Sequence, residues 1–202
     1  GPGYTCFGDS GLPTAKFLAI WAPGIGVQRT PADSAFEIPA GSRLVMQMHY
    51  NVLNLGGAEA PADRSRAELW TLPEGETPRN RLSMVPYADV WFDVPAGATV
   101  DWPSEYEVAA DAKIVAIAPH MHALGTSISM SLERQDGSET CLVDVPRWDF
   151  NWQDLYWFPH DQPVEVKAGD LLRNHCVYDN SAGNQPVVNG ERMPPRDVRW
   201  GD

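Results

Sequence analysis

Residues 113–132 read KIVAIAPHMHALGTSISMSL, and this stretch decides the fold class. Two short runs in it, 113–117 and 127–132, have the length and pattern of β-strands, and a segment with Pro and Gly separates them. Similar runs occur at 42–50 and 171–178, whereas helical periodicity is weak. Many short strands joined by turns predict an all-β protein, an antiparallel β-sandwich or jelly roll.

One turn pattern recurs at residues 38–41, 94–97 and 166–169, each time with glycine in the fourth place. The glycine stands just ahead of the next β-like segment in each case. A tight turn that needs a positive φ favours glycine at such a position. We also expect a strand near 67–72 and a domain boundary near 55–65.

Composition excludes several classes of function. The 202 residues include 15 Lys and Arg against 27 Asp and Glu, a formal net charge of −12, and such a surface repels nucleic acid. No apolar run of about 18 residues is present, so no membrane span is predicted. The first residues lack the basic and apolar regions of a signal peptide.

The three cysteines are Cys6, Cys141 and Cys176, and they form no Cys-x-x-Cys motif. A structural zinc knuckle is therefore not expected. An odd number of cysteines leaves at least one thiol without a partner inside the sequence.

His120 and His122 are the candidate metal ligands. In extended chain, residues two apart point to the same side, about 6.6 Å apart, so both imidazoles can reach one ion with bonds of about 2.0 Å. Imidazole suits copper, zinc, iron or nickel, so the spacing names no metal. A partly exposed histidine pair without a metal is the alternative.

His49 closes the apolar run 42–50. By alternation it shares one face with Gln47, while Leu44, Met46, Met48 and Tyr50 on the other face are expected in a core. His49 is then on a surface or in a site.

Residues 147–158, RWDFNWQDLYWF, are rich in aromatic side chains. We expect a strand pair whose aromatics fill the core, with Asp149, Asn151 and Gln153 on the opposite face. A carbohydrate-binding surface is the alternative.

The order of several motifs resembles the copper type II, ascorbate-dependent monooxygenases across nearly the whole chain. These motifs are Cys6-Phe7-Gly8, Trp21-Ala22-Pro23-Gly24, Gln47-Met48-His49-Tyr50-Asn51, His120-Met121-His122 with Leu124-Gly125, Asp149-Phe150-Asn151-Trp152-Gln153, Ala168-Gly169-Asp170, Cys176-Val177-Tyr178-Asp179-Asn180 and Trp200-Gly201.

The resemblance implies two antiparallel jelly-roll-like domains, each with one copper, that face each other across a cleft. It implies that His49 is the third histidine of an electron-transfer copper. It also implies that His120 and His122 bind the oxygen-activating copper together with a methionine. Copper would be the cofactor, ascorbate the reductant, and O2 and a small molecule the substrates.

The sequence departs from the family pattern in three places. No two histidines are adjacent, so the resemblance implies that residues 1–60 are the C-terminal part of the first domain. Residues 61–202 would be the second domain, ending before the Glu-Met-Cys motif that supplies the methionine and, by the resemblance, the disulfide partner of Cys176. Ala118 replaces the arginine with which peptide-amidating members bind a carboxylate. We therefore expect an incomplete fragment that does not complete the two-copper reaction by itself.

Two other hypotheses stay open. In one, the chain is a non-catalytic β-sandwich module that binds copper or sugar. In the other, it is a cupin-like metalloenzyme in which His175 joins His120 at the metal. We assign no role to His160. The family resemblance implies a secreted or periplasmic protein.

Overall fold

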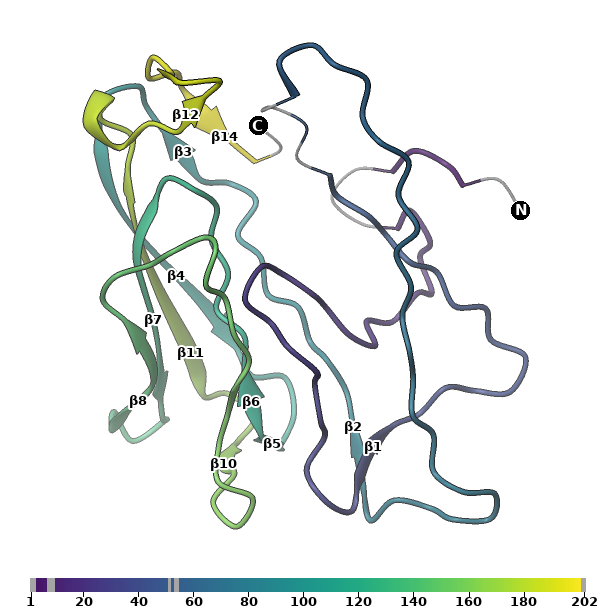
Figure 1. Cartoon of the computed structure of the whole chain (residues 1–202). Coiled ribbons are helices and arrows are strands. Elements are labelled where there is room, and N and C mark those ends of the chain that lie inside the picture. Colours follow the sequence, from purple (N-terminus) through teal and green to yellow (C-terminus); the bar gives the residue numbers. More distant parts are fainter. Residues whose placement is uncertain (1–2, 7–9, 51, 53–54, 201–202) are drawn as a thin grey trace.

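The protein is all-β in the computed structural model, which describes residues 3–6, 10–50, 52 and 55–200 (Figure 1). A short 3-10 helix, η2, covers Ala182–Asn184. The strands are β1 (Ser34–Phe36), β2 (Asn80–Leu82), β3 (Asp93–Val94), β4 (Thr99–Glu107), β5 (Ala112–Ile114), β6 (Ala116–Ile117), β7 (Gly125–Glu133), β8 (Glu139–Val145), β9 (Tyr156–Trp157), β10 (Val164–Val166), β11 (Leu171–Asp179), β12 (Val187–Val188), β13 (Glu191–Arg192) and β14 (Val198–Arg199).

The main sheet has the strand order β4-β11-β7-β8, and every neighbouring pair in it is antiparallel. Because side chains alternate along a strand, each strand gives one row of side chains to the core and one to the outer face. On β11, Cys176 is in the core, whereas Arg173 and His175 line a hollow on the outer face. The sheet therefore has one apolar and one polar side.

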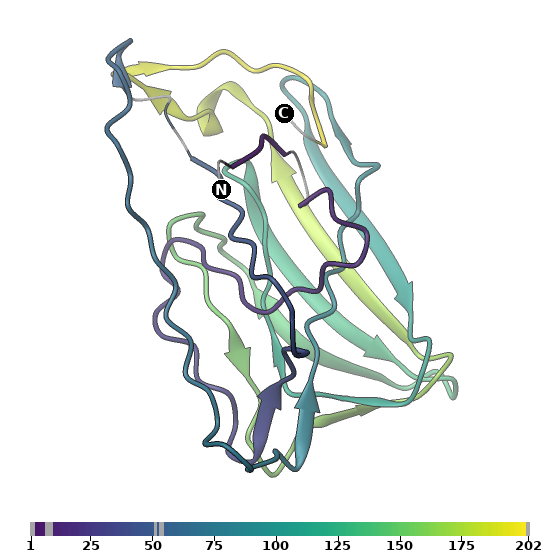
Figure 2. The same cartoon turned by 90° about the vertical axis from the view of Figure 1, so that its right-hand side faces the viewer.

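A second layer of short strand pairs covers the apolar side. β5 pairs with β10 and β6 pairs with β9, both antiparallel (Figures 1 and 2). The core between the layers holds Leu132 of β7, Ile117 of β6 and Val166 of β10, and Leu132 is fully buried. This arrangement of packed layers confirms the predicted β-sandwich fold class.

The last strands are fastened to the sandwich by a buried amide. β14 pairs with β3, and Asn180 is fully buried between them and β11. Its Nδ2 donates to the carbonyl oxygens of Val94, Pro95 and Arg196 at 2.8 to 3.0 Å. Gln185 in turn donates to Asn180 Oδ1 at 2.8 Å. A buried amide with such partners fixes the chain where the strands are too short to do so.

Residues 3–91 contain little regular structure. Among the described residues of this region, the parallel pair β1–β2 is the only strand pairing. Both cartoon views show the rest as long, extended chain that runs beside the sandwich (Figures 1 and 2).

The strand predictions are confirmed in the main sheet. Residues 127–132 lie within β7 and 171–178 within β11. Residues 113–117 are split into β5, which pairs with β10, and β6, which pairs with β9. The turn prediction holds for the backbone of all three glycines, since Gly41, Gly97 and Gly169 have φ of 79°, 79° and 89°. Gly97 and Gly169 precede β4 and β11, whereas no strand follows Gly41 in residues 42–50.

The strands predicted at 42–50 and 67–72 are wrong. Both stretches are described and neither pairs with another strand. Leu44 and Met46, expected in a core, are 63% and 53% exposed. Strand-like alternation is not sufficient, because a strand needs a neighbour that satisfies its N–H and C=O groups.

Candidate metal site

The His-Met-His segment lies in the connection between β6 and β7. A turn closes it, in which the N–H of Gly125 donates to the carbonyl of His122 at 3.0 Å. The backbone before the turn is nevertheless extended enough for side chains to alternate. Met121 is 2% exposed, while His120 and His122 on either side of it are exposed.

Met121 anchors this segment to the sandwich. It packs with Ile128 and Cys176 in a second buried cluster, against the half-buried Trp148. Gly125 allows this, since a Cβ there would stand 2.7 to 2.9 Å from the Met121 side chain. Burial of the methionine turns both imidazoles outward on the same side.

The two imidazoles are close neighbours. Their ring centroids are 5.2 Å apart and the ring planes meet at 81°. His122 also stands edge-on to Phe150, with centroids 6.2 Å apart. The structure thus brings His120 and His122 together, at a separation compatible with a shared ion of bond length about 2.0 Å.

His122 is held in the form that binds metals. Surrounding atoms desolvate its ring although the side chain is exposed, and this is the main reason why its pKa is lowered. The charges of His120 and then His49 lower the pKa further. A lowered pKa favours the neutral imidazole, whose free nitrogen lone pair is the metal ligand.

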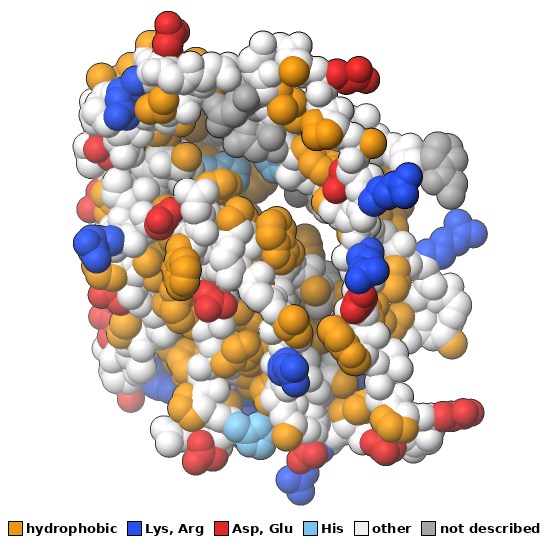
Figure 3. Space-filling view, in the orientation of Figure 1, with side chains coloured by type: hydrophobic (Ala, Val, Ile, Leu, Met, Phe, Trp, Pro, Cys, Tyr) orange, Lys and Arg blue, Asp and Glu red, His pale blue; other side chains and the backbone are white. Residues whose placement is uncertain are grey.

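His49 lies within electrostatic reach of the pair. It is exposed, and its charge acts on His122. Pale-blue histidine side chains are visible inside a hollow on the upper part of the molecular face, with apolar side chains around them (Figure 3). Within the part of the chain that the structure describes, no group of three or more His, Cys, Asp and Glu residues is placed to hold a metal ion.

His160 and His175 are placed elsewhere. His160 Nε2 donates to the carbonyl of Ala32 at 3.1 Å, across to the first region of the chain. His175 forms an ion pair with Asp101. Because its neighbour Cys176 faces Met121, His175 points to the opposite side of the sheet. This placement gives no support to His175 as a third ligand beside His120.

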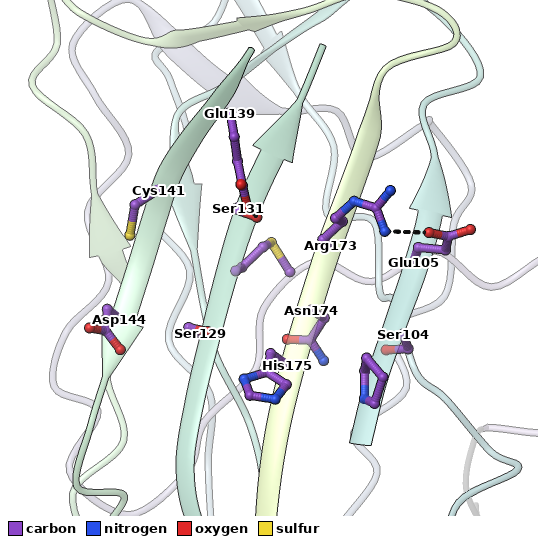
Figure 4. Close-up of a pocket in the computed structure, with 12 residues that line it drawn as sticks. Ser104, Glu105, Ser129, Ser131, Glu139, Cys141, Asp144, Arg173, Asn174 and His175 are labelled. Carbon is purple, nitrogen blue, oxygen red and sulfur yellow. Dashed lines mark hydrogen bonds and ion pairs between the residues drawn. The ribbon is translucent and has the colours of Figure 1, made fainter. Parts of the chain in front are cut away.

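A hollow of about 720 Å³ lies over His175 on the outer face of the main sheet. Ser129 and Ser131 form its floor, and Arg173 and Glu105 border it with an ion pair of 2.8 Å (Figure 4). It is an open surface hollow on the other side of the sheet from the histidine pair.

The aromatic segment 147–158 lies beside the histidine pair and differs from the prediction. Only Tyr156–Trp157, β9, is a strand in it. Asp149 Oδ1 accepts the N–H of Asn151 at 2.9 Å, and the resulting turn breaks the alternation. Trp152 is consequently 74% exposed, while Gln153, expected on a polar face, is 3% exposed.

Gln153 is a site residue that the sequence pattern missed. Its Oε1 is 2.7 Å from Nδ1 of His120. Its backbone N–H donates to the carbonyl of Pro23 at 2.9 Å, so the motif 21–24 meets the motif 149–153 here. Phe7, Gly8, Asn51 and Gly201, which also belong to the quoted motifs, lie outside the described residues.

Residues 104–194 match the family model of the copper type II ascorbate-dependent monooxygenase C-terminal domain. This part of the chain is similar to that domain. The match covers β7, β11 and the histidine pair, and it agrees with the resemblance seen in the sequence. No curated protein matches the chain.

The family is copper- and ascorbate-dependent, which implies a small-molecule substrate and O2. No helix in the described part of the chain is long and apolar enough to cross a bilayer. Cys6, Cys141 and Cys176 are all free, so the disulfide expected for the family is not seen and stays a prediction.

Proposed function

We propose that His120 and His122 hold one copper ion and that the domain takes part in hydroxylating a C–H bond of a small molecule. In such a reaction one oxygen atom of O2 enters the C–H bond. The other leaves as water, with two electrons from ascorbate and two protons. Bound copper would supply the one-electron redox chemistry and the activation of O2.

The observation that carries this proposal is the pair of outward imidazoles fixed by one buried methionine. A loop residue would normally leave its side chain free to rotate, and two free imidazoles lose conformational entropy on binding one ion. Here the burial of Met121 fixes the backbone between them beforehand. The imidazole donors suit copper, and the family of the domain selects copper among the metals that imidazole binds.

His49 extends the proposal to a second copper. We assign it to the electron-transfer ion, because it is exposed and its charge reaches His122. No group of three His, Cys, Asp or Glu residues in the described part of the chain completes either site. The complete two-copper reaction is therefore proposed for the chain together with further ligands, and the half-site for this chain itself.

Copper titration tests the half-site. Competition against a Cu(I) chelator should give one copper per chain bound through the pair, and His120→Ala with His122→Ala should weaken it by about a hundredfold or more. His160→Ala is the matched control, since it removes an exposed imidazole that donates to the carbonyl of Ala32. Unchanged copper stoichiometry and affinity in the double variant would contradict the proposal.

A non-catalytic binding module is the second candidate, and the exposure of Trp152 beside the histidine pair favours it. Copper- and ascorbate-dependent O2 uptake separates the two functions. Uptake that requires both His120 and His122 supports the monooxygenase. Copper or sugar binding without any uptake, when the missing ligands are supplied by a longer chain, supports the module.

A further inference from the structure

Gln153 is nearly inaccessible to solvent and is hydrogen-bonded at both ends of its side-chain amide. At one end Nε2 donates to the carbonyl oxygen of Phe150 at 2.8 Å. At the other end Oε1 is 2.7 Å from His120 Nδ1. The side chain is 3% exposed, so little of the amide is open to water.

The contact with Phe150 decides which way the amide points. A carbonyl oxygen only accepts hydrogen bonds, so the atom of Gln153 that faces Phe150 is the NH2 group. The oxygen Oε1 therefore faces His120, and it too only accepts. It follows that His120 Nδ1 carries the proton, and that in the neutral ring Nε2 keeps its lone pair.

We propose that Gln153 is the positioning residue of the site: it fixes the ring and the tautomer of His120 so that Nε2 is the metal-binding atom. The metal-binding part of this statement rests on the proposed function. Ligand histidines commonly have their second nitrogen held by an acceptor of this kind, and losing that acceptor typically weakens metal binding 10- to 100-fold. The ring of His122 instead makes a T-shaped contact with the ring of Phe150.

The backbone of Gln153 is held by a segment far away in the sequence. Its N–H donates to Pro23, and Gly24 lies so close that a Cβ there would be 2.8 Å from the nitrogen of Gln153 and 2.9 Å from its oxygen. Ile25, which follows, is buried and closes the turn through a bond to Ala22. Residues 21–25 thus hold the backbone of Gln153 in place.

The tautomer of His120 can be read in the metal-free protein by long-range 1H–15N NMR on histidine-labelled samples, with His120→Ala to assign the signals. In the wild-type chain we expect Nδ1–H and a bare Nε2. Finding Nε2–H instead would overturn the proposal, and the tautomer itself is read in the wild-type chain.

Gln153→Leu should release the ring toward the Nε2–H form that histidine prefers in water. Gln185→Leu is the matched control: it removes another buried amide, 5% exposed, that bonds to Asn180 and not to a histidine. We expect it to lower stability without changing the His120 tautomer. A tautomer that is unchanged in Gln153→Leu, or shifted equally in Gln185→Leu, would contradict the role of Gln153.

The effect of Gln153 on copper affinity is measured separately, by competition against a Cu(I) chelator. Gln153→Leu is expected to weaken copper binding 10- to 100-fold, and Gln185→Leu to leave it unchanged. If the wild-type chain binds no copper through the pair, the proposed function fails while the tautomer result still decides the positioning of His120. If copper binds with equal affinity to wild type and Gln153→Leu, the positioning role toward the metal is wrong and the proposed function stands.

Discussion

Residues 92–199 and residues 3–91 differ sharply in how they use their apolar side chains. Apart from Ile25, every buried hydrophobic residue of the described chain lies between Val94 and Cys176. In the first region Trp21 and Trp70 are 72% and 76% exposed. Apolar residues are thus available in both regions, but among the described residues the first region has one short strand pair, β1–β2, whereas the second has a four-stranded sheet against which they pack.

The difference shows that strand pairing, not apolar content, forms the core. In the second region β7 and β11 satisfy each other's backbone groups and present Leu132 and Cys176 to the same interior. Single hydrogen bonds join the first region to the second, such as those of Pro23 with Gln153 and of Ala32 with His160. Stability is therefore expected to reside in the second region.

The largest effect is expected when leucine is replaced by alanine in each region, which tests where the stability resides. Leu132→Ala removes a fully buried side chain from β7 and should lower the free energy of unfolding by about 3 kcal/mol, through lost burial and the cavity that remains. Leu44→Ala, at a side chain 63% exposed, should change it by about 0.5 kcal/mol or less. Urea unfolding followed by tryptophan fluorescence measures both. Equal losses would show that residues 42–50 pack into a core of their own.

The same contrast explains which parts of the fold could be predicted from the sequence. Residues 127–132 and 171–178 have strand pattern and also neighbours, so both became strands. Residues 42–50 have the same pattern and no neighbour among the described residues, and a local pattern contains no information about a distant partner. The turn glycines were predictable because a positive φ is a local requirement.

A smaller effect is expected where the two regions touch. Gly24 has a φ of 98° and contacts the backbone of Gln153, so Gly24→Ala should favour local opening there by about 2 kcal/mol. The amide of Gln153, which is bonded to Pro23, should then exchange its hydrogen about 30-fold faster, since 1.36 kcal/mol is a factor of ten. Gly26→Ala is the control, because nothing lies within 4 Å of a Cβ at that position. Unchanged exchange in Gly24→Ala would mean that the contact is not maintained in solution.

This contact also explains why the candidate site was predicted only in part. The spacing of His120 and His122 is a local feature, and an extended backbone brings such rings together wherever it occurs. The role of Gln153 depends on a turn at Asp149 and on Pro23, which is distant in the sequence. The available signal was the turn-forming sequence around Asp149, which argues against strand alternation there.

The smallest expected effect comes from a comparison of one surface arginine in each region. Arg173 on β11 bridges Glu105 of β4 and Glu133 of β7, at 2.8 and 2.6 Å, and so links three strands. Arg81 pairs only with Glu37, at 2.9 Å, beside the short pair β1–β2. Both arginines are substantially exposed, so solvent screening keeps either contribution small.

Arg173→Met should lower the thermal midpoint by about 3 °C or less at low salt, and Arg81→Met should leave it unchanged. The difference between the two variants should shrink in 0.5 M NaCl, where the Debye length is only about 4 Å and exposed charges no longer interact over the width of a sheet. Calorimetry at two salt concentrations measures this. A larger drop of the thermal midpoint in Arg81→Met would contradict this prediction and place the stabilising ion pairs in the first region. The reason is that an ion pair shifts the midpoint only if it joins elements that unfold together.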